Sequence, residues 1–543
     1  MKRFKLFLAM AFLSACIALV ICYASPYAPV VGNAPEDIEE IWAIEDARTE
    51  SAEPLVTALE NNGVPLAYDA EKNTFYCTLG VDNGDEWPQI HLTAPGAPNV
   101  RLMFADDYTY DWCRDAIRDG YAYQVMAYTD AHFAYFDLVF TGLPMVIMTA
   151  EEEIDTDDVP VEIVISAYGS EPLRSHARAH IRGASTLSHE KKSYKVEFTR
   201  EADGRRKAVR SVPGFYAMEA VNLNPMVHDE LLVREKLSWD LYESLVPHDE
   251  PFGARMTQYA EVFLNGSYRG IYLMVEPMNC AEELAKDGTR AMTDSVYRTA
   301  VLSFSRDRAY VNHPYRANTG YELYHHPAAG TEDAFKLLQP WIDLNRTKDD
   351  GDFIRKGLAC VDMQSLVRFD LFIQAAAMTD NVFNNMYIIA HPQAGGVQYT
   401  FAPWDMDMTW GRKKAECGEN FENWIFFPVA DRMINLDAGG QLRSLVADTW
   451  AQMRASVFNI ETIERKMEEY TFLLGETGAW ARNAEKWNFD TYYPDLYNMI
   501  VFTELRLAVM DQAIEAIASG GEESIPFLAA TQYEGKSTPI VAQ

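Results

Sequence analysis

The sequence predicts an α+β protein in which a β-rich first half precedes a mostly helical second half. Two observations carry this prediction. Short segments with alternating apolar and polar residues recur as far as about residue 276, between clusters of Gly, Pro, Asn and Asp that are typical of turns. From about residue 331 onward, apolar residues recur at helical spacing. With 543 residues the chain is too long for one hydrophobic core, so we expect two or three domains.

The N-terminus carries the pattern of an export signal. Three basic residues within the first five positions precede an apolar run over residues 6–24, and residues 22–24 fit a signal peptidase site. We therefore predict that residues 1–24 are a signal peptide or membrane anchor, and that the rest of the protein is extracellular or anchored on the cell envelope. Residues 13–16 also resemble a lipoprotein box, and the apolar run is long enough to remain as an anchor. Cleavage, lipidation and anchoring are therefore alternatives.

Charge and cysteine content argue against several classes of protein. The 47 basic and 80 acidic residues give a net charge of −33, which argues against binding to nucleic acid or to anionic membranes. Of the seven cysteines, five follow the export signal at wide spacing, a pattern that excludes a disulfide scaffold and a zinc knuckle. One bridge, such as Cys77–Cys113, could form, and buried free thiols are expected for the rest.

Residues 25–145 are predicted to form a β-rich accessory module. After a short helical start near residues 38–61, residues 74–79, 89–92 and 100–104 show short β-type patterns between turn-forming clusters. No motif in this module indicates its function.

The next section, residues 146–280, should form a second β-rich unit. Apolar leucines at helical spacing predict an amphipathic helix between residues 225 and 246. The pair Asn265-Gly266, which is preferred in type I′ turns, predicts a hairpin. The strands are expected over residues 161–165, 193–198, 259–264 and 268–275.

Residues 281–520 are predicted to be mostly helical, and a polar tail follows over residues 521–543. A strongly apolar helix is predicted over residues 361–378, and it leads into Asp380. A second hairpin should follow, and then three helices. These elements are expected over residues 386–390 and 397–404, and at about residues 440–457, 460–473 and 496–518.

Two polar clusters lie on either side of the second hairpin. The first runs from Asp380 to Asn385, and the second contains Asp405 and Asp407. The predicted elements follow the order of parts in a protein kinase. That order is a strand with lysine, a helix, a hairpin that ends in an acidic residue, a buried helix and then these two clusters. The spacing from Asp380 to Asn385 also matches the Asp-x-x-x-x-Asn of a kinase catalytic loop. Taken singly, these residues could shape turns; together they predict a site for metal and triphosphate.

Four groups of residues resemble the signatures of the spore-coat CotH kinase family. They are residues 182–186 with 191–198, residues 232–237, residues 261–276, and residues 401–407 with Gly411. The resemblance spans roughly residues 140 to 450 and leaves the accessory module outside. It implies an atypical, two-lobed protein-kinase-like fold, with a β-rich N-lobe over residues 146–280 and a helical C-lobe over residues 281–520.

The resemblance also implies an activity, a metal and a substrate class. It implies a protein kinase that binds ATP with Mg²⁺ or Mn²⁺ and phosphorylates Ser or Thr residues of proteins, in spore formers those of the coat. By motif, Asp405 would coordinate the metal, and Asp380 would orient or deprotonate the acceptor hydroxyl. Asn385 would be a metal ligand, and Asp407 would be a second ligand or support the first. Hard cations prefer such oxygen ligands. Basic, Ser/Thr-rich proteins are the expected substrates.

Five further residues are candidates for nucleotide binding. Lys192 or Lys195 would neutralise phosphate charge from a strand, and because they are three positions apart only one should face the nucleotide. We favour Lys192, which belongs to the Lys-Lys-x-Tyr signature, and Arg182 could add a phosphate contact. Glu276 ends the hairpin where a kinase hinge would meet adenine or ribose. Glu235 could pair with the strand lysine, or it could be a solvated helix residue.

Other functions on the same fold stay open at this point. The chain has no Gly-x-Gly-x-x-Gly phosphate loop, so residues 182–186 would have to serve in its place. A non-catalytic surface adhesin is one alternative, since some fungal proteins that resemble this family are regarded as host-binding invasins. Another metal-dependent transferase is a second alternative, because Asp405-Met406-Asp407 also fits the Asp-x-Asp of glycosyltransferases.

Overall fold

The structure is a computed structural model of the chain. The predicted export signal over residues 1–24 and the tail over residues 521–543 lie outside the residues that it describes. No helix within the described ranges is long and apolar enough to cross a membrane. The described residues are 30–31, 38–80, 90–105, 113–183, 185–247, 250–278, 293–300, 321–326, 334–379, 381–382, 384–412, 421–422, 424–425, 427–488 and 493–520.

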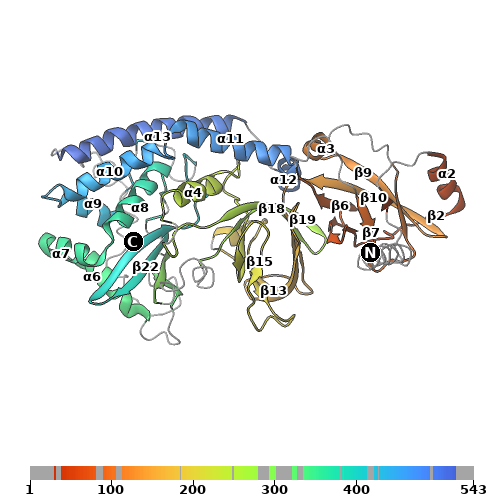
Figure 1. The fold of residues 1–543 in the computed structure, drawn as a ribbon, viewed down its shortest axis with the longest axis horizontal. Helices are drawn as coiled ribbons and strands as arrows, with labels where there is room; N and C mark the ends of the chain where they lie inside the picture. The colour runs from red at the N-terminus through yellow and green to blue at the C-terminus, as the bar shows by residue number, and fades with distance from the viewer. Residues whose placement is uncertain are drawn as a thin grey trace, which may run out of the picture.

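Two sheets form the first part of the described chain, drawn at the red and orange end of Figure 1. Their buried faces enclose an apolar core that includes Phe75, Val125 and Leu138. The smaller sheet has the order β1 (Val30–Val31), β7 (His91–Thr93), β3 (Glu60–Asn61) and β4 (Val64–Pro65). The larger has the order β5 (Ala67–Asp69), β6 (Thr74–Thr78), β10 (His132–Thr141), β9 (Ala122–Tyr128) and β8 (Arg101–Phe104), with β2 (Thr49–Glu50) beside β10.

The strands expected near residues 74–79 and 100–104 are confirmed, but the helical start is shorter than predicted. Helix α2 covers Ile38–Ala47, and residues 49–50 and 60–61 pair as strands. A second helix, α3 (Cys113–Asp119), was not predicted. The suggested Cys77–Cys113 bridge is wrong, because Cys77 is buried and belongs to no disulfide.

A closed seven-stranded barrel follows the two sheets. Val196, Val221 and Tyr272 point into its apolar interior, so the alternate residues of the same strands point outward. A parallel pairing between β11 and β18 closes the barrel. In order, its strands are β11 (Met145–Thr149), β12 (Val159–Ser166), β13 (Leu173–Arg182), β14 (Ser193–Thr199), β17 (Ala220–Asn224), β19 (Ser267–Val275) and β18 (Thr257–Leu264). A 3₁₀ turn and a small ribbon lie outside it, η1 (Ser185–Ser188) and β15 (Arg210–Ser211) with β16 (Ala217–Met218).

The hairpin predicted from Asn265-Gly266 is confirmed in β18 and β19. Both turn residues have positive φ, 51° and 69°, as a type I′ turn requires. The helix expected between residues 225 and 246 is shorter: α4 covers Arg234–Glu243. Positive φ angles at Met226 and Leu232 keep the preceding segment out of the helix.

The remaining described chain is mostly helical around a four-stranded sheet, which confirms the α+β prediction. The strand order is β21 (Tyr321–His325), β20 (Ser295–Ala300), β22 (Asn384–Gln393) and β23 (Gly396–Pro403), so the second predicted hairpin is confirmed with longer strands. The helices are α6 (Gln339–Arg346), α7 (Asp350–Cys360), α8 (Met363–Ala376), α9 (Pro428–Asn435), α10 (Gln441–Ala455), α11 (Ile460–Glu476), α12 (Ala479–Trp487) and α13 (Tyr493–Ser519), with a 3₁₀ turn, η3 (Ala334–Leu337).

Helices α11, α12 and α13 run along one long edge of the molecule (Figure 1). Helix α12 packs on β19 of the barrel, and α11 contacts α3 of the first part of the chain. The C-terminal helices therefore connect all three parts.

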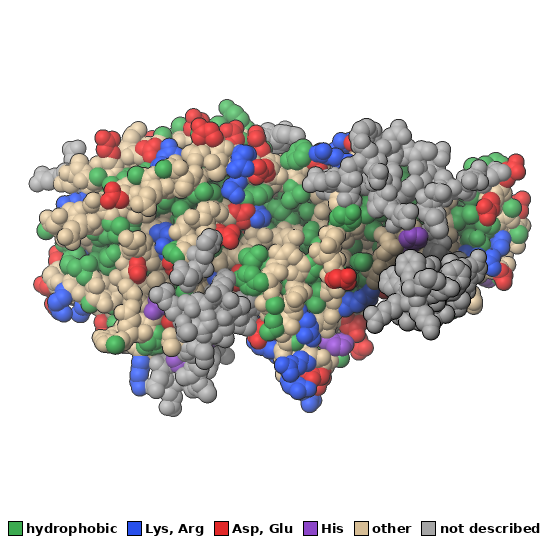
Figure 2. All heavy atoms as spheres, viewed as in Figure 1, with side chains coloured by type: hydrophobic (Ala, Val, Ile, Leu, Met, Phe, Trp, Pro, Cys, Tyr) green, Lys and Arg blue, Asp and Glu red, His purple; other side chains and the backbone are tan. Residues whose placement is uncertain are grey.

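The charged side chains lie at the surface. Figure 2 shows Asp and Glu side chains distributed over the face in view, with Lys and Arg side chains among them. Much of the net negative charge is therefore solvated.

Candidate functional site

The candidate site lies where the outer face of the barrel meets α4 and the end of β23. Val221 and Leu223 of β17 point into the barrel core, so Asn222 and Asn224 point to the opposite face. The side-chain amide of Asn224 donates to Glu235 Oε1 at 2.7 Å, and its oxygen accepts from Arg182 Nη1 at 3.0 Å. Three side chains from β13, β17 and α4 are thus joined in one polar chain.

Arg182 connects this chain of polar side chains to the second predicted cluster, which contains Asp405 and Asp407. Its guanidinium lies over the ring of Trp404, with Cζ 5.0 Å from the ring centroid. Trp404 is buried and immediately precedes Asp405. The motif residues Arg182, Glu235 and Asp405 therefore come from distant parts of the sequence to one place, as the kinase order of parts predicts.

Asp405 is presented at the end of β23 by a specific backbone arrangement. The Trp404 N–H donates to the Asn385 carbonyl at 2.9 Å, and Asn381 Nδ2 donates to the Trp404 carbonyl at 2.5 Å. Both Asn385 and Asp405 have positive φ, 53° and 56°, a conformation that Asn and Asp adopt more readily than most residues. The side chain of Asp405 is exposed, whereas Asp407 is buried.

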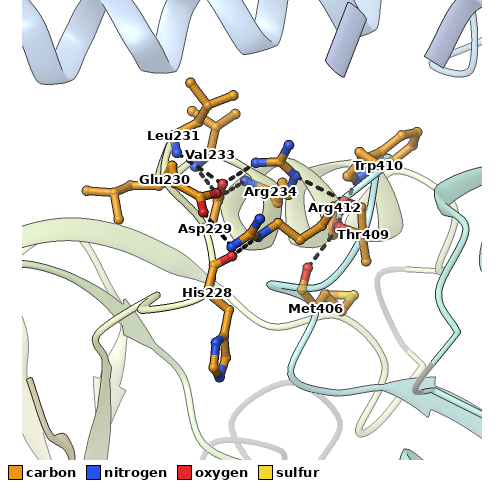
Figure 3. Close-up of polar contacts among 12 residues, drawn as sticks. His228, Asp229, Glu230, Leu231, Val233, Arg234, Met406, Thr409, Trp410 and Arg412 are labelled. Atoms are coloured by element: carbon orange, nitrogen blue, oxygen red, sulfur yellow. Dashed lines mark hydrogen bonds and ion pairs between the residues drawn. The ribbon is translucent and has the colours of Figure 1, made fainter. Parts of the chain in front are cut away.

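The loop from Asp405 to Arg412 is anchored to α4, as Figure 3 shows. Arg234 forms a buried ion pair with Asp229 and donates to the Thr409 carbonyl at 3.1 Å. Asp229 also accepts the N–H groups of Val233 and Arg234, each at 2.7 Å, which starts the helix. Arg412 makes an ion pair with Glu230 at 2.5 Å.

A second set of contacts ties the same loop to the middle of α4. The indole of Trp410 donates to Ser238 Oγ at 2.9 Å, and the hydroxyl groups of Ser238 and Thr409 lie 3.2 Å apart. The loop and the helix therefore form one unit, and a shift of α4 would move the segment that follows Asp405.

Glu235 is deeply buried, with 2% of its surface exposed, so the interpretation as a solvated helix residue is wrong. Burial, together with the charge of Asp405, raises the pKa of Glu235 to about 8. The two carboxyl groups thus interact across the site. A divalent cation would relieve this repulsion, and the oxygen donors Asp405, Asp407 and Asn385 suit a hard cation.

Of the two lysines that were predicted to lie on one strand, only Lys195 belongs to β14. Lys192 precedes β14 and donates to the Leu187 carbonyl at 2.7 Å, so the alternation within a strand does not decide which lysine faces the site. Lys195 pairs with Glu197 at 2.9 Å, and Glu235 takes Asn224 as its partner instead of a lysine. Lys191 is buried and donates to the Ile271 carbonyl at 2.5 Å and to Asn483 at 3.1 Å.

Glu276 lies at the end of β19 in a fully buried ion pair with Arg255, 3.2 Å away. Its second oxygen accepts the N–H of Met256 at 3.1 Å. The carboxylate therefore joins the ends of β18 and β19. Contact with adenine or ribose through Glu276 stays a prediction, and it would compete with the Arg255 pair.

The predicted acceptor residue, Asp380, lies outside the described residues. Among those that are described, no three His, Cys, Asp or Glu side chains come together as a metal site. The backbone nevertheless brings Asn385 and Asp405 to the same end of the β22–β23 hairpin, where Met386 pairs with Pro403. The predicted metal ligands Asn385 and Asp405 therefore lie at neighbouring strand ends.

The sequence patterns missed Asn224 and the stacking role of Trp404. Asn224 carries no motif, although its place on the last strand before α4 could have drawn attention to it, since kinases carry their lysine on the strand that precedes the corresponding helix. For Trp404, no role was predicted.

Comparison with known proteins agrees with this geometry. No curated protein matches the chain. The family model described as CotH kinase protein matches residues 179–510, more than half of the chain. The match includes Arg182, Glu235 and Asp405, and it excludes the first two sheets. The chain therefore belongs to the CotH kinase family.

Proposed function

We propose that this protein is an exported protein kinase that transfers phosphate from Mg·ATP to Ser or Thr residues of other proteins. The observation that carries the proposal is the Arg182–Asn224–Glu235 chain, which ends over the Trp404–Asp405 corner. This chain supports the proposal because it holds Arg182 against Trp404, the neighbour of the predicted metal ligand Asp405, and phosphoryl transfer needs a cation and a metal ligand close together.

The proposal assigns a role to each residue. Asp405 and Asn385 would hold Mg²⁺ or Mn²⁺, supported by Asp407, and the metal would neutralise the ATP phosphates. Arg182 would contact the phosphates through the N–H donors of its guanidinium. Asp380 would accept the proton of the acceptor hydroxyl while the hydroxyl oxygen forms a bond to the γ-phosphorus. The bond from that phosphorus to the bridging oxygen would break at the same time, which leaves ADP.

The remaining nucleotide candidates have smaller roles in this proposal. Lys195 would contribute long-range positive charge, while Lys192 would position the turn beside Arg182 through the Leu187 carbonyl. Basic, Ser/Thr-rich proteins at the cell envelope are the proposed substrates, because a net charge of −33 favours encounter with basic partners.

The test uses residues 25–543, labelled ATP and either Mg²⁺ or Mn²⁺. We expect label on the protein itself or on a basic Ser-rich substrate, and we expect it to disappear in Asp405→Asn and Asp380→Asn. Asp343→Asn, which alters an exposed carboxylate on α6, is the matched control and should keep full activity. Absence of label with both metals would overturn the proposal.

Two further measurements separate the alternative functions. A binding-only adhesin would show no shift of Tm with Mg·ATP. A different transferase would leave a mass on the product other than that of phosphate, such as that of an adenylyl or glycosyl group. Either result would replace the kinase assignment.

A further inference from the structure

The strand that precedes α4 carries no lysine. In protein kinases, a lysine on the strand before the corresponding helix forms an ion pair with a helix glutamate, and that pair must be in place for activity. Here the strand is β17, whose sequence is Ala-Val-Asn-Leu-Asn, and the helix glutamate is Glu235. The partner of Glu235 on this strand is Asn224.

The orientation of the Asn224 amide follows from its two neighbours. A guanidinium can only donate hydrogen bonds, so Arg182 must bind the amide oxygen. Glu235 then receives the amide N–H, as the 3.0 Å and 2.7 Å distances record. Asn224 is 7% exposed and Glu235 is 2% exposed, so the loss of either hydrogen bond would leave a polar group buried without compensation.

An amide differs from a direct ion pair in one electrostatic respect. A glutamate in contact with a lysine neutralises much of the charge that the lysine offers to phosphate. A neutral amide fixes the direction of Arg182 without supplying a negative charge. The contact with Asn224 therefore cancels none of the charge of the guanidinium, while Trp404 supports its face.

We propose that Asn224 is a positioning residue that joins Arg182 to Glu235 and takes the place of the lysine–glutamate ion pair of protein kinases. The inference rests on the proposed function, because it assigns Arg182 to the nucleotide phosphates. Asn224 touches neither phosphate nor metal in this scheme. It holds the cation that does, and it couples that cation to α4 and thus to the loop after Asp405.

Asn222 supplies a matched control on the same strand. It points to the same side of β17, is 1% exposed, and its amide makes no hydrogen bond within the described part of the chain. Asn222→Ala removes the same atoms as Asn224→Ala from a buried position, but it breaks no contact between Arg182 and Glu235.

The first experiment measures the affinity for Mg·ATP by calorimetry. We expect Asn224→Ala to bind about tenfold or more weakly than wild type, and Asn222→Ala to bind within about twofold of it. Asn224→Asp keeps the shape but places a carboxylate against Arg182, so we expect it to weaken binding as well. Equal affinity in Asn224→Asp and wild type would overturn the inference, even if Asn224→Ala does not fold.

The second experiment needs no nucleotide. Thermal unfolding of Arg182→Ala, Glu235→Gln and the double variant gives the coupling between two side chains that Asn224 joins by hydrogen bonds. We expect the effects to be clearly non-additive in the natural background and closer to additive in Asn224→Ala, where only the direct interaction of the two charges remains. Additive effects in both backgrounds would overturn the inference.

The two experiments separate the inference from the proposed function. If the wild-type protein binds no Mg·ATP but the coupling through Asn224 is present, the kinase assignment fails and the polar chain stands as structure alone. If Mg·ATP binds and Asp405→Asn abolishes transfer, while Asn224 variants bind as wild type does, the kinase assignment stands and the role of Asn224 is refuted.

Discussion

At the scale of single residues, the cation at the site is distinguished by its shape as much as by its charge. Arg182 uses one nitrogen for Asn224 and presents its planar face to Trp404. A lysine has the same charge but neither the fork of donors nor the flat surface. The proposed phosphate site therefore depends on an arginine at this position, in a chain for which a strand lysine was predicted.

We expect Arg182→Lys to weaken Mg·ATP binding by roughly fivefold to thirtyfold, because the stacked and fork-shaped contacts are lost while the charge remains. Calorimetric titration measures the change. Arg174→Lys, on the exposed part of the same strand, is the control and should bind as wild type does. Equal affinity in both variants would show that charge alone suffices at Arg182.

A second residue-scale feature is a pair of buried carboxyl groups between α8 and α9. Burial raises the pKa of Asp370 to about 7, and burial together with the charge of Asp370 raises the pKa of Asp431 well above its usual range. A folded-state pKa above the unfolded value means that the protonated groups favour folding. This stability is fully present below about pH 4 and is lost as the pH rises through about 7.

Asp370→Asn removes one ionisation and keeps an acceptor for Gln374 Nε2, which lies 3.1 Å from the carboxylate. We expect the variant to match wild type near pH 4 and to be more stable by roughly 1 to 3 kcal/mol at pH 8. Thermal unfolding across this pH range is the measurement, with Asp343→Asn on exposed α6 as control. Parallel pH profiles for Asp370→Asn and wild type would contradict the assignment.

At the scale of elements, α4 connects the barrel to the loop after Asp405, so that a shift of the helix would also move the loop. Its first turn holds Arg234, whose ion pair with Asp229 is almost completely buried. Breaking a buried pair by removing one partner leaves the other charge without compensation. The helix and the loop should therefore loosen together.

We expect Arg234→Met to lower the free energy of unfolding by about 3 to 5 kcal/mol and to speed hydrogen exchange over residues 404–412. Arg412→Met disrupts an ion pair whose acid, Glu230, is exposed, and we expect a cost of about 1 kcal/mol or less. Denaturant titration and exchange mass spectrometry measure the two effects. A similar cost for both variants would argue against the anchoring role of Arg234.

Local patterns predicted the elements with strong local signals. The Asn265-Gly266 turn, the apolar helix α8 and the β22–β23 hairpin were all expected, because turn chemistry and apolar runs act over a few residues. Helix α4 was predicted to be longer and amphipathic, and there is a physical reason why its amphipathic character was predicted wrongly. It is buried on nearly every side, Glu235 included, so no polar face marks its orientation in the sequence.

At the scale of the whole molecule, contacts between distant segments could not be predicted from the sequence. The barrel closes through β11 and β18, which pair Met145 with Glu261 across more than a hundred residues. The Arg182–Asn224–Glu235 chain depends on the pairing of β13 with β14 and of β14 with β17, which brings Arg182 and Asn224 to the same end of the sheet. The family signatures identified Arg182 and Glu235, but only the register of β17 brings Asn224 between them.

One buried polar cluster joins all three parts of the chain. Arg482 of α12 donates to both oxygens of Glu261 in the barrel, at 2.9 and 2.8 Å, and to the hydroxyl of Thr141 at the end of β10, at 2.8 Å. Tyr268 also donates to Glu261 at 2.7 Å. Burial alone would raise the pKa of Glu261, but the charge and hydrogen bonds of Arg482 hold it below its usual value.

We expect Arg482→Met to cost about 3 to 5 kcal/mol, because Glu261 would stay buried without its cation. Since Thr141 belongs to the first part of the chain, calorimetry should show the two N-terminal sheets unfolding in a separate, earlier transition. Adding Glu261→Gln should recover part of the stability, because no unpaired charge then remains. Arg114→Met, which breaks a more exposed bridge to Glu476, should cost no more than about 1 kcal/mol. A single unchanged transition in Arg482→Met would show that other contacts hold the three parts together.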